Sequence, residues 1–464
     1  MRNLVKKIVR EDNFLSLAGN LAIAFFAFAG FALLARSFAM EEFGKWVLFT
    51  ASFAFIEMFR LGITNTAIVR YLSGLSSEER YQFIGSNALI GLIATFFISS
   101  ILLTCYYFFS EPIRRAGYEL FFIWYPLMAL VNLPINNAIV VMQSDQHFGK
   151  ILLLRILESG SFFLIVIINF LFMKMTLTQI VLSWIIIDLF VSGYCFLNGW
   201  DGMKFIVKAT RKSSGTLLDF GKYTTFTLIG TNLLRSTDAF IISLSPLGTA
   251  AVALYSIPMR LTELQQIPLR SFAATAFPKM SKESMNGKIS EVKELFYTYS
   301  GAMTILFVFI SIFVFIFADL FVLILGGKQY AGLDPVTGFN AATIVRIFTI
   351  YGLLLPIDRM TGIGLDSVNR PDKNFIKVLY MVIANIIGDL IAIFVFKSLS
   401  MVAVTSILFT SLGVWIGFHL LNKELDLEFF QINRHGISFY RSLIRKIKDH
   451  LIKRKGQSET VNKF

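Results

Sequence analysis

The sequence predicts an all-α polytopic membrane protein with about twelve transmembrane helices in two six-helix lobes around a central cavity. Of the 464 residues, 55% are hydrophobic and 49 are phenylalanine, whereas a soluble domain is roughly 45–50% apolar. The excess is arranged in blocks of about twenty residues, the length that crosses a bilayer core. Charged residues nevertheless recur inside several of these blocks, which indicates a polar interior.

The helices are placed by the length of each apolar block and by its flanking charges. No polar stretch between them is long enough to bury a core, so we expect no soluble domain. The charged start of the chain lacks the pattern of a cleavable signal peptide. The expected helix cores are Ser16–Ala35, Phe43–Ile63, Phe83–Phe108, Leu120–Met142, Ile151–Phe172, Ile180–Phe196, Tyr223–Leu244, Ala250–Phe272, Tyr297–Leu325, Ala341–Ile357, Phe375–Phe396 and Met401–Leu421.

Lysine and arginine are distributed unevenly between the loops, and this predicts the orientation. If the N-terminus is cytoplasmic, most basic residues fall in inward segments and few fall in outward loops. Both ends of the chain are therefore expected in the cytoplasm. The same asymmetry explains the net charge of +13 without a nucleic-acid partner.

The longest inward connection follows the sixth helix and is basic and flexible in composition. It divides the chain into an N-terminal six-helix lobe (1–200), a cytoplasmic linker (201–222), a C-terminal six-helix lobe (223–425) and a basic tail (426–464). In the tail, apolar residues at steps of three or four alternate with Arg and Lys, which predicts an amphipathic helix on the inner leaflet. A plain positive anchor and a dedicated lipid-binding role both fit this pattern.

Acidic and basic residues lie three positions apart in four of the predicted helices. A charge at mid-bilayer costs at least about 2.5–3.5 kcal/mol, and residues three apart share one helix face. These faces must therefore point into the protein or into a watery cavity. Together with polar stripes on the second, fourth, seventh and eighth helices, they predict a cavity between those helices and the first. The pairs are Glu57 with Arg60, Arg155 with Glu158, Arg235 with Asp238, and Arg260 with Glu263.

Arginine presents a planar fork that suits phosphate, so we interpret the cavity as an anion site. In the alternative interpretation, each pair neutralises itself and ties helices together. Arg346 has no acid three or four residues away and is a stronger candidate, whereas Arg155 lies near a cytoplasmic end where long side chains snorkel. The candidate substrate-binding residues are Arg60, Arg235, Arg260, Arg346, Glu57, Asp238 and Glu263.

Embedded acids and arginines are similar in number, so counting leaves the sign of the cavity open. Asp188 and Asp389 are candidates for binding a coupling proton or Na⁺, although each can equally be a satisfied core carboxyl. Pro258 and Pro268 flank Arg260 in the eighth helix. A proline inside a helix frees a carbonyl and bends the rod, so we expect this helix to act as a hinge.

No motif for a cofactor or for catalysis is found. The two cysteines are expected near opposite membrane faces, and the four histidines lack metal-ligand spacing. No P-loop and no HExxH motif occurs. We therefore predict no cofactor, no metal and no enzymatic activity.

Two segments resemble bacterial polysaccharide flippases. Phe43–Ser73, FGKWVLFTASFAFIEMFRLGITNTAIVRYLS, is similar to their second-helix region. Ser236–Pro268, STDAFIISLSPLGTAAVALYSIPMRLTELQQIP, is similar to their charged seventh helix, short Leu-Gly loop and eighth helix. The stretch Phe277–Ser281 resembles the start of the inner loop that follows.

That family belongs to the multidrug/oligosaccharidyl-lipid/polysaccharide exporter superfamily. The resemblance implies a V of two six-helix lobes in the bacterial cytoplasmic (inner) membrane. It also implies a flippase that moves undecaprenyl-diphosphate-linked oligosaccharide from the inner to the outer leaflet by alternating access, for O-antigen or capsule synthesis. Its implied partners are this lipid-linked oligosaccharide, membrane lipids, and the polymerase and glycosyltransferases of the pathway.

The related lipid II flippase uses arginines on its first, second and eighth helices, and Arg60 and Arg260 occupy the second and eighth here. The first helix has no charge between Phe14 and Ala35, which departs from that pattern. Two alternatives remain. A cation-coupled drug antiporter of the same superfamily would need unpaired acids for cationic cargo. A membrane glycan polymerase would need a larger outward loop than this chain has.

Overall fold

The structure is a computed structural model that describes residues 12–72, 77–335, 337–442 and 444–445. Within these ranges, the side chains of 12–21, 63, 66, 70, 77, 220–228, 231 and 235 lie outside the description. Each of the twelve predicted segments is occupied by one helix or by an interrupted helix. The prediction of an all-α polytopic fold is therefore confirmed.

Seven helices in the described part of the chain are long and apolar enough to cross a membrane, and a bent pair makes an eighth. α3, α10 and α11, which carry three of the four predicted charge pairs, are not among them, whereas the span Phe148–Leu171, which carries Arg155 and Glu158, is. Long helices with charged stripes need protein or water beside them. Apolar helices with exposed phenylalanines, such as α4 with Phe96 and Phe97, suit contact with lipid.

The helices pack as two units. Unit 1 comprises residues 1–257 and 322–339, and unit 2 comprises residues 258–321 and 340–464. The boundary thus falls at Pro258, whereas the sequence places its linker at 201–222, because α10 packs along α3 inside unit 1. The segment 322–339 joins unit 1 because Arg36 donates to the carbonyls of Leu323 and Ile324.

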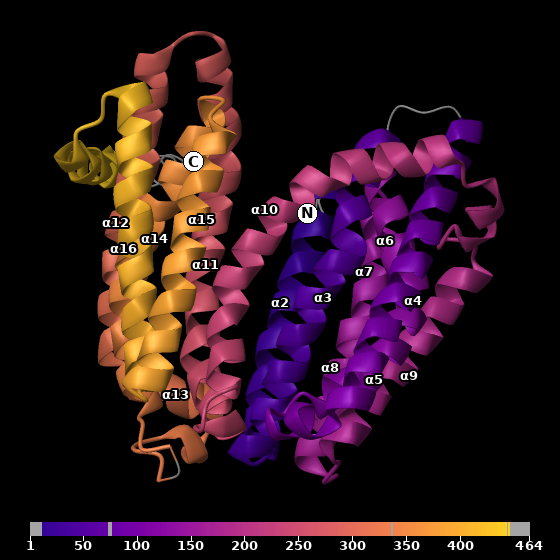
Figure 1. Cartoon of the computed structure of the whole chain (residues 1–464). Helices are drawn as coiled ribbons and strands as arrows, with labels where there is room; N and C mark the ends of the chain where they lie inside the picture. Colours follow the sequence, from indigo (N-terminus) through magenta and orange to yellow (C-terminus); the bar gives the residue numbers. More distant parts are fainter. Residues whose placement is uncertain (1–11, 73–76, 336, 443, 446–464) are drawn as a thin grey trace, which may run out of the picture. The chain divides into compact units, whose positions relative to one another are not determined.

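Unit 1 is built from long helices that run side by side (Figure 1). Its fourth span is bent by 50° between α5 and α6, and its fifth contains the π-helical turn η1. Its helices are α2 (Asp12–Ser37), α3 (Met40–Leu72), α4 (Ser77–Arg115), α5 (Glu119–Val131), α6 (Leu133–Ser144), α7 (Phe148–Arg155), η1 (Ile156–Gly160), α8 (Ser161–Leu171), α9 (Leu177–Leu197), η2 (Met203–Lys208), α10 (Arg211–Ser243) and the first part of α11 (Gly248–Met285).

The bend in the fourth span has a local cause. Pro134 stands at the start of α6, has no N–H to donate to the Leu130 carbonyl and crowds that carbonyl with its ring, so the helix breaks here and neighbouring carbonyls of α5 lose their helical donors. Side chains replace those donors: Arg60 Nη1 donates to the Ala129 carbonyl at 2.7 Å, and Ser192 Oγ donates to the Val131 carbonyl at 2.5 Å. Such replacement is the condition for breaking a helix inside a membrane.

The start of α3 packs closely against the start of α11. A Cβ added to Gly44 would lie 1.8 Å from the carbonyl oxygen of Thr249. Only glycine permits this approach of two backbones. The contact joins the Phe43-Gly44 and Leu247-Gly248 segments on which the resemblance partly rests.

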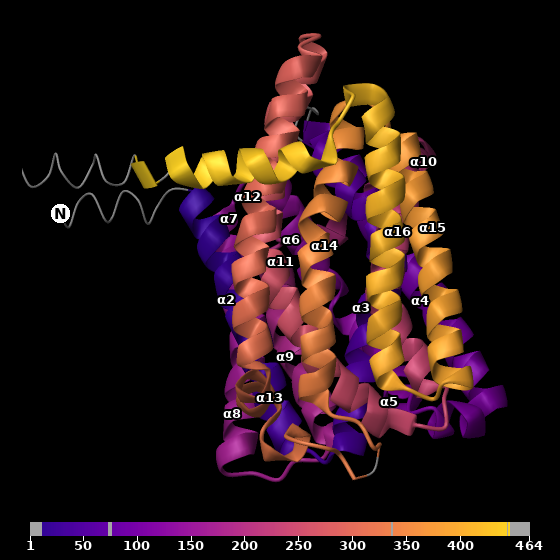
Figure 2. The ribbon, with the colours of Figure 1, turned by 90° about the vertical axis from the view of Figure 1, so that its left-hand side faces the viewer.

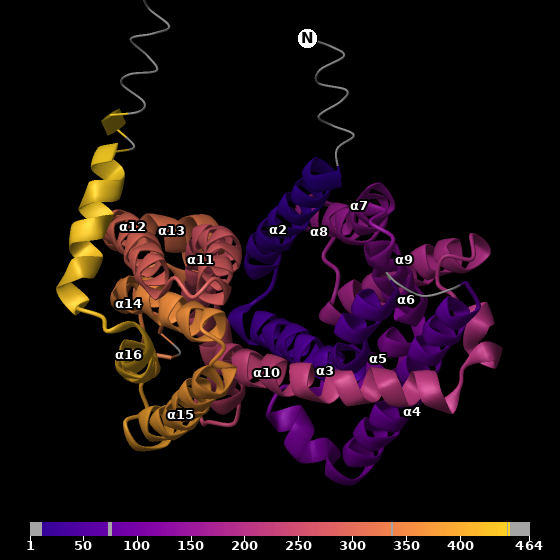
Figure 3. The same ribbon diagram turned by 90° about the horizontal axis from the view of Figure 1, so that it is seen from above.

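Unit 2 contains a bundle that Figure 3 shows end-on, with α15 against α16. Its helices are the rest of α11, α12 (Ile289–Ile316), α13 (Ala318–Gly326, shared with unit 1), α14 (Ala341–Ser367), α15 (Pro371–Leu390), the π-helical turn η4 (Ile391–Val395) and α16 (Leu399–Leu425). A 3-10 turn, η3 (Lys328–Tyr330), lies in the segment of unit 1 between α13 and α14.

The predicted tail helix is present over 429–442 and at 444–445. It runs across the direction of α12 (Figure 2). Its Gly436 backbone meets that of Gly301, where an added Cβ would lie 2.1–2.6 Å from tail-helix backbone atoms, and Tyr440 donates to the Ala302 carbonyl at 3.0 Å. Its outer side exposes an apolar row beside basic residues: Phe430, Ile437 and Ile444, with Arg434, Arg441 and Arg445.

Candidate functional site

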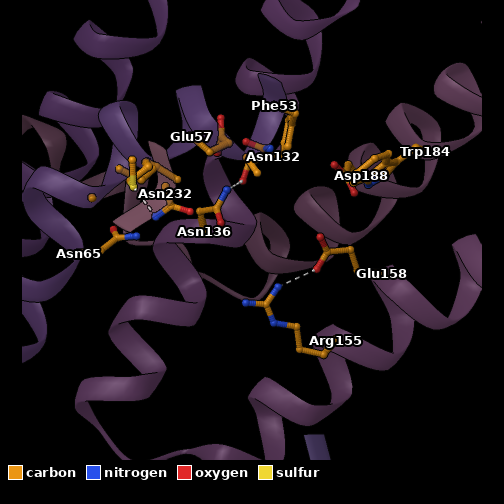
Figure 4. Close-up of a pocket in the computed structure, with 14 residues that line it drawn as sticks. Phe53, Glu57, Asn65, Asn132, Asn136, Arg155, Glu158, Trp184, Asp188 and Asn232 are labelled. Carbon is orange, nitrogen blue, oxygen red and sulfur yellow. Dashed lines mark hydrogen bonds and ion pairs between the residues drawn. The ribbon is translucent and has the colours of Figure 1, made fainter. Parts of the chain in front are cut away.

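A cavity of about 390 Å³ lies inside unit 1 (Figure 4). It is walled by α3, by the bend between α5 and α6, by α7 and η1, by α9 and by α10. The second, fourth and seventh predicted helices contribute as expected, and the fifth and sixth contribute in addition. The eighth and the first, which were also expected, supply none of the lining residues described. The lining residues are Phe53, Ala54, Glu57, Met58, Leu61, Gly62, Asn65, Asn132, Asn136, Arg155, Glu158, Trp184, Asp188 and Asn232.

Arg60 is enclosed behind this cavity rather than exposed in it. It is 1% exposed and is not one of the lining residues. Its Nε and Nη2 donate to both carboxylate oxygens of Glu57, at 2.8 and 2.6 Å, and Nη2 also donates to Asn132 Oδ1 at 2.6 Å. Its Nη1 donates to Thr95 and to the Ala129 carbonyl.

All five N–H groups of Arg60 are therefore used. This geometry does not favour the prediction that Arg60 binds the substrate, because its guanidinium has no free donor and no exposed surface. Arg60 instead holds the wall together, since it fixes Glu57, the bend at Ala129 and Asn132 at once. Glu57, which was also predicted as a site residue, does line the cavity, and it accepts a further hydrogen bond from Tyr125 at 3.0 Å.

The network also orients two amides. Arg60 can only donate, so the Asn132 oxygen must face it and the Asn132 NH₂ group is turned elsewhere. Asn136 donates its NH₂ to the Asn132 carbonyl at 3.1 Å, which leaves Asn136 Oδ1 as an acceptor. Both residues line the cavity, so one offers it a donor and the other an acceptor.

Arg155 is the arginine that lines the cavity within the described residues. It stands at the end of α7, and Glu158 follows it in the π-helical turn η1 (Figure 4). Their contact is long, 3.5 Å from Nη1 to Oε2, and the Arg155 side chain is 34% exposed. Most of its donors thus have no partner among the described residues. Single π-helical turns occur often at functional sites.

Asp188 lies beside Trp184 on α9 (Figure 4). It is 1% exposed, and its Oδ1 has no hydrogen-bond partner within the described part of the chain. Trp184 is held by other rings, with centroids 5.2 Å from Phe162 and 5.6 Å from Phe53. The α9 wall therefore brings together an aromatic side chain and a buried carboxylate oxygen without a hydrogen-bond partner.

The lining is acidic in balance. Three carboxylates, Glu57, Glu158 and Asp188, line the cavity with one arginine, Arg155, and Arg60 stands behind Glu57. Glu57 and Glu158 each have an arginine partner, so Asp188 is the carboxylate without one among the described residues. The net charge of the cavity, which counting in the sequence left open, is therefore negative in this unit and does not suit an anion.

The remaining predicted residues lie elsewhere. The Arg235 side chain is outside the described residues, and its neighbour Asp238 accepts a hydrogen bond from Tyr255 at 2.8 Å. Arg260 and Glu263 form a 2.6 Å ion pair in unit 2, with side chains 28% and 36% exposed.

Arg346 pairs with Asp319 on α13, so its lack of an acid nearby in sequence does not leave it free. Asp389 is fully buried and accepts hydrogen bonds from Asn385 at 3.0 Å and Thr405 at 2.6 Å. The expected breaks at Pro258 and Pro268 are absent, since α11 remains one helix through both.

Sequence reasoning missed Arg155, Glu158 and Trp184 as site residues. Arg155 and Glu158 have the spacing of a charge pair, but the position of Arg155 near a helix end suggested a side chain that snorkels to the membrane surface. The π-helical turn that contains Glu158 could not be recognised from the sequence. A further expectation concerned metals. Among the described residues, no group of three or more His, Cys, Asp or Glu side chains is placed to hold a metal ion.

Residues 9–284 match the family described as "Polysaccharide biosynthesis protein". A search of curated proteins finds no match. Among solved structures, the fold is similar to the lipid II flippase MurJ in an inward closed conformation, with a TM-score of 0.70 and 14% identity over 93% of this chain and 91% of that one.

It is also similar to an inward-facing multidrug resistance MATE transporter of the MOP superfamily, with a TM-score of 0.69 and 14% identity over 86% and 95% of the two chains. A MOP superfamily transporter from Pyrococcus furiosus, described as having a binding pocket of reversed polarity, gives 0.58 and 14% over 90% and 95%. At these identities the likeness establishes the fold.

Proposed function

The chain belongs to the polysaccharide biosynthesis protein family, and from this premise we propose that it is a flippase for a lipid-linked saccharide. The proposed cargo is undecaprenyl-diphosphate-linked oligosaccharide. It is moved from the inner to the outer leaflet of the cytoplasmic membrane by alternating access, for a surface polysaccharide such as O-antigen or capsule. Glycosyltransferases would supply this cargo and a polymerase would use it.

One observation carries the proposal: a polar cavity lies among the helices of unit 1, several of which are long and apolar enough to cross a membrane. Charged and amide side chains from five walls converge on it, and such groups are costly inside a helical membrane protein unless they serve a polar pathway. A saccharide head group leaves water only where polar partners replace its hydration. The prenyl chain needs no such site because it is apolar and stays in the lipid bilayer.

We assign the contacts with the cargo to two groups of residues. In unit 1 we assign contact with the head group to Arg155, with Arg60 and Glu57 as positioning residues. For the diphosphate we retain Arg260, which is part-exposed, and Arg235. Asp238 and Glu263 would then set the orientation of these arginines, and Asp188 and Asp389 are the proposed coupling groups for a proton or Na⁺.

The test is reconstitution. Purified protein in liposomes should speed the exposure of an undecaprenyl-diphosphate-linked saccharide to an external lectin. Arg155→Ala should slow this at least about tenfold, about 1.4 kcal/mol, and Arg155→Lys should retain part because only the fork is lost. Arg115→Ala, at a side chain that is 79% exposed, is the matched control. Rates equal to those of empty liposomes would refute the function.

A cation-coupled drug antiporter is the second candidate, and the acidic lining favours it. Asp188 offers a carboxylate without a cationic partner among the described residues, as a cationic cargo would need. This candidate predicts efflux of cationic dyes that Asp188→Asn abolishes. Dye efflux by the purified protein, with no movement of the saccharide lipid, would decide for it.

A further inference from the structure

We propose that the cavity of unit 1 binds the sugar residues of the cargo rather than its diphosphate, on Trp184 and the amides of Asn65, Asn132 and Asn136. The inference rests on the proposed function and names the part of the cargo that this site takes. It follows from the kinds of side chain that line the cavity, their free hydrogen-bonding atoms and the aromatic face beside them.

The side chains that line the cavity suit the sugars of the head group better than its diphosphate. A diphosphate accepts hydrogen bonds and carries negative charge, so it needs donors and cations. The cavity instead offers three carboxylates and one guanidinium, and its four asparagines both donate and accept. Sugar hydroxyls also both donate and accept, so this mixed lining suits a neutral polyhydroxylated ligand and repels a diphosphate.

The free atoms are arranged for such a ligand. Asn132 has its NH₂ group available and Asn136 its carbonyl oxygen, because Arg60 and the helix backbone occupy the other ends. Asn65 makes no hydrogen bond through its side chain to the described residues. Asp188 Oδ1 is buried without a partner in the described chain, and such an acceptor is destabilising until a donor reaches it.

Trp184 supplies the apolar contact. The C–H face of a sugar ring is apolar and slightly positive, and it packs on the negative face of an aromatic ring. The indole is locked by Trp46, Phe49, Phe53 and Phe162, with centroids 5.2–6.3 Å away. A platform that is already rigid loses little entropy on binding. The volume of about 390 Å³ lies within the usual range for small-ligand sites, roughly 300–1,000 Å³.

Binding measurements test the assignment. The probes are undecaprenyl diphosphate and the lipid-linked saccharide that accumulates in a strain lacking this protein. Native mass spectrometry of the full-length protein in detergent gives both affinities. Wild-type protein should prefer the saccharide lipid at least about tenfold, which is about 1.4 kcal/mol. Asn136→Ala and Trp184→Leu should reduce the preference to about twofold while leaving the affinity for undecaprenyl diphosphate unchanged.

The controls are Asn433→Ala and Trp415→Leu, both at exposed positions of unit 2, and both should keep the full preference. If Trp184→Leu fails to fold by thermal melting, Trp184→Phe and Asn136→Ala decide. Equal affinities of the wild-type protein for the two lipids, or variants that lose both equally, would overturn the sugar site alone. A deletion strain that accumulates no lipid-linked saccharide would overturn the proposed function and this site with it.

Discussion

Arg60 and Arg155 differ sharply in their surroundings, although each stands three residues from a glutamate. Arg60 makes five hydrogen bonds and has no exposed side-chain surface, whereas Arg155 makes one long contact and is a third exposed. A buried pair whose hydrogen bonds are all made holds a structure in place. A part-exposed guanidinium with spare donors can meet a ligand.

Removal of Arg60 should therefore reduce stability. Arg60→Met leaves Glu57, whose side chain is 15% exposed, without its cationic partner, and breaking a fully buried pair costs about 3–5 kcal/mol, which is the upper limit here. We expect a lower melting temperature in detergent by fluorescence-detected size exclusion. The double variant Arg60→Met with Glu57→Gln also removes the carboxylate charge, so it should recover part of the lost stability. Arg115→Met, at an exposed pair, should melt like the wild type. Equal melting of the wild type and the three variants would show that Arg60 does not hold the wall.

At the scale of the secondary-structure elements, interruptions in the helices determine which side chains line the cavity. The bend at Asn132 turns two amides toward the cavity, and the π-helical turn Ile156–Gly160 follows Arg155 directly and contains Glu158. Each irregularity releases or shifts backbone groups that side chains must then satisfy. Regular helices at these positions would present different faces.

The tail helix is an element whose attachment depends on two glycines. A Cβ on Gly436 would lie 2.4 Å from the Gly301 carbonyl oxygen, so Gly436→Ala must push the tail helix away from α12. We expect trypsin to cleave at Arg434 and Arg441 on the order of tenfold faster, since cleavage follows the detached population. Gly193→Ala, in α9 with open space around it, is the matched control. Unchanged cleavage would show that the tail helix tolerates the wider crossing.

At the scale of the whole molecule, α11 connects the two packing units. Its residues belong to unit 1 up to Ile257 and to unit 2 from Pro258 onward. Pro258 and Pro268 therefore lie at and just after the boundary, in a helix that is continuous. A proline lacks one helical hydrogen bond, so a helix bends there at less cost.

The proline hinge gives a rate prediction. Pro258→Ala with Pro268→Ala restores two hydrogen-bond donors and should stiffen α11. Since conformational steps limit many transport and catalytic cycles, we expect flipping in liposomes to slow at least about threefold at normal expression. Pro278→Ala in the same helix, far from the boundary, should leave the rate unchanged. Full activity of the double variant would exclude a hinge at these prolines.

The sequence by itself determined the helical fold and its spans, because apolar length and flanking charge are local properties that a bilayer enforces. It also identified the charge pairs Glu57 with Arg60 and Arg260 with Glu263, since residues three apart must share a face. Tertiary structure alone decided what each face meets. Arg60 is enclosed, Arg346 has a partner 27 residues away, and Arg155 meets Trp184 and Asp188 across a cavity. Spacing along one helix fixes a direction, and only packing determines what lies there.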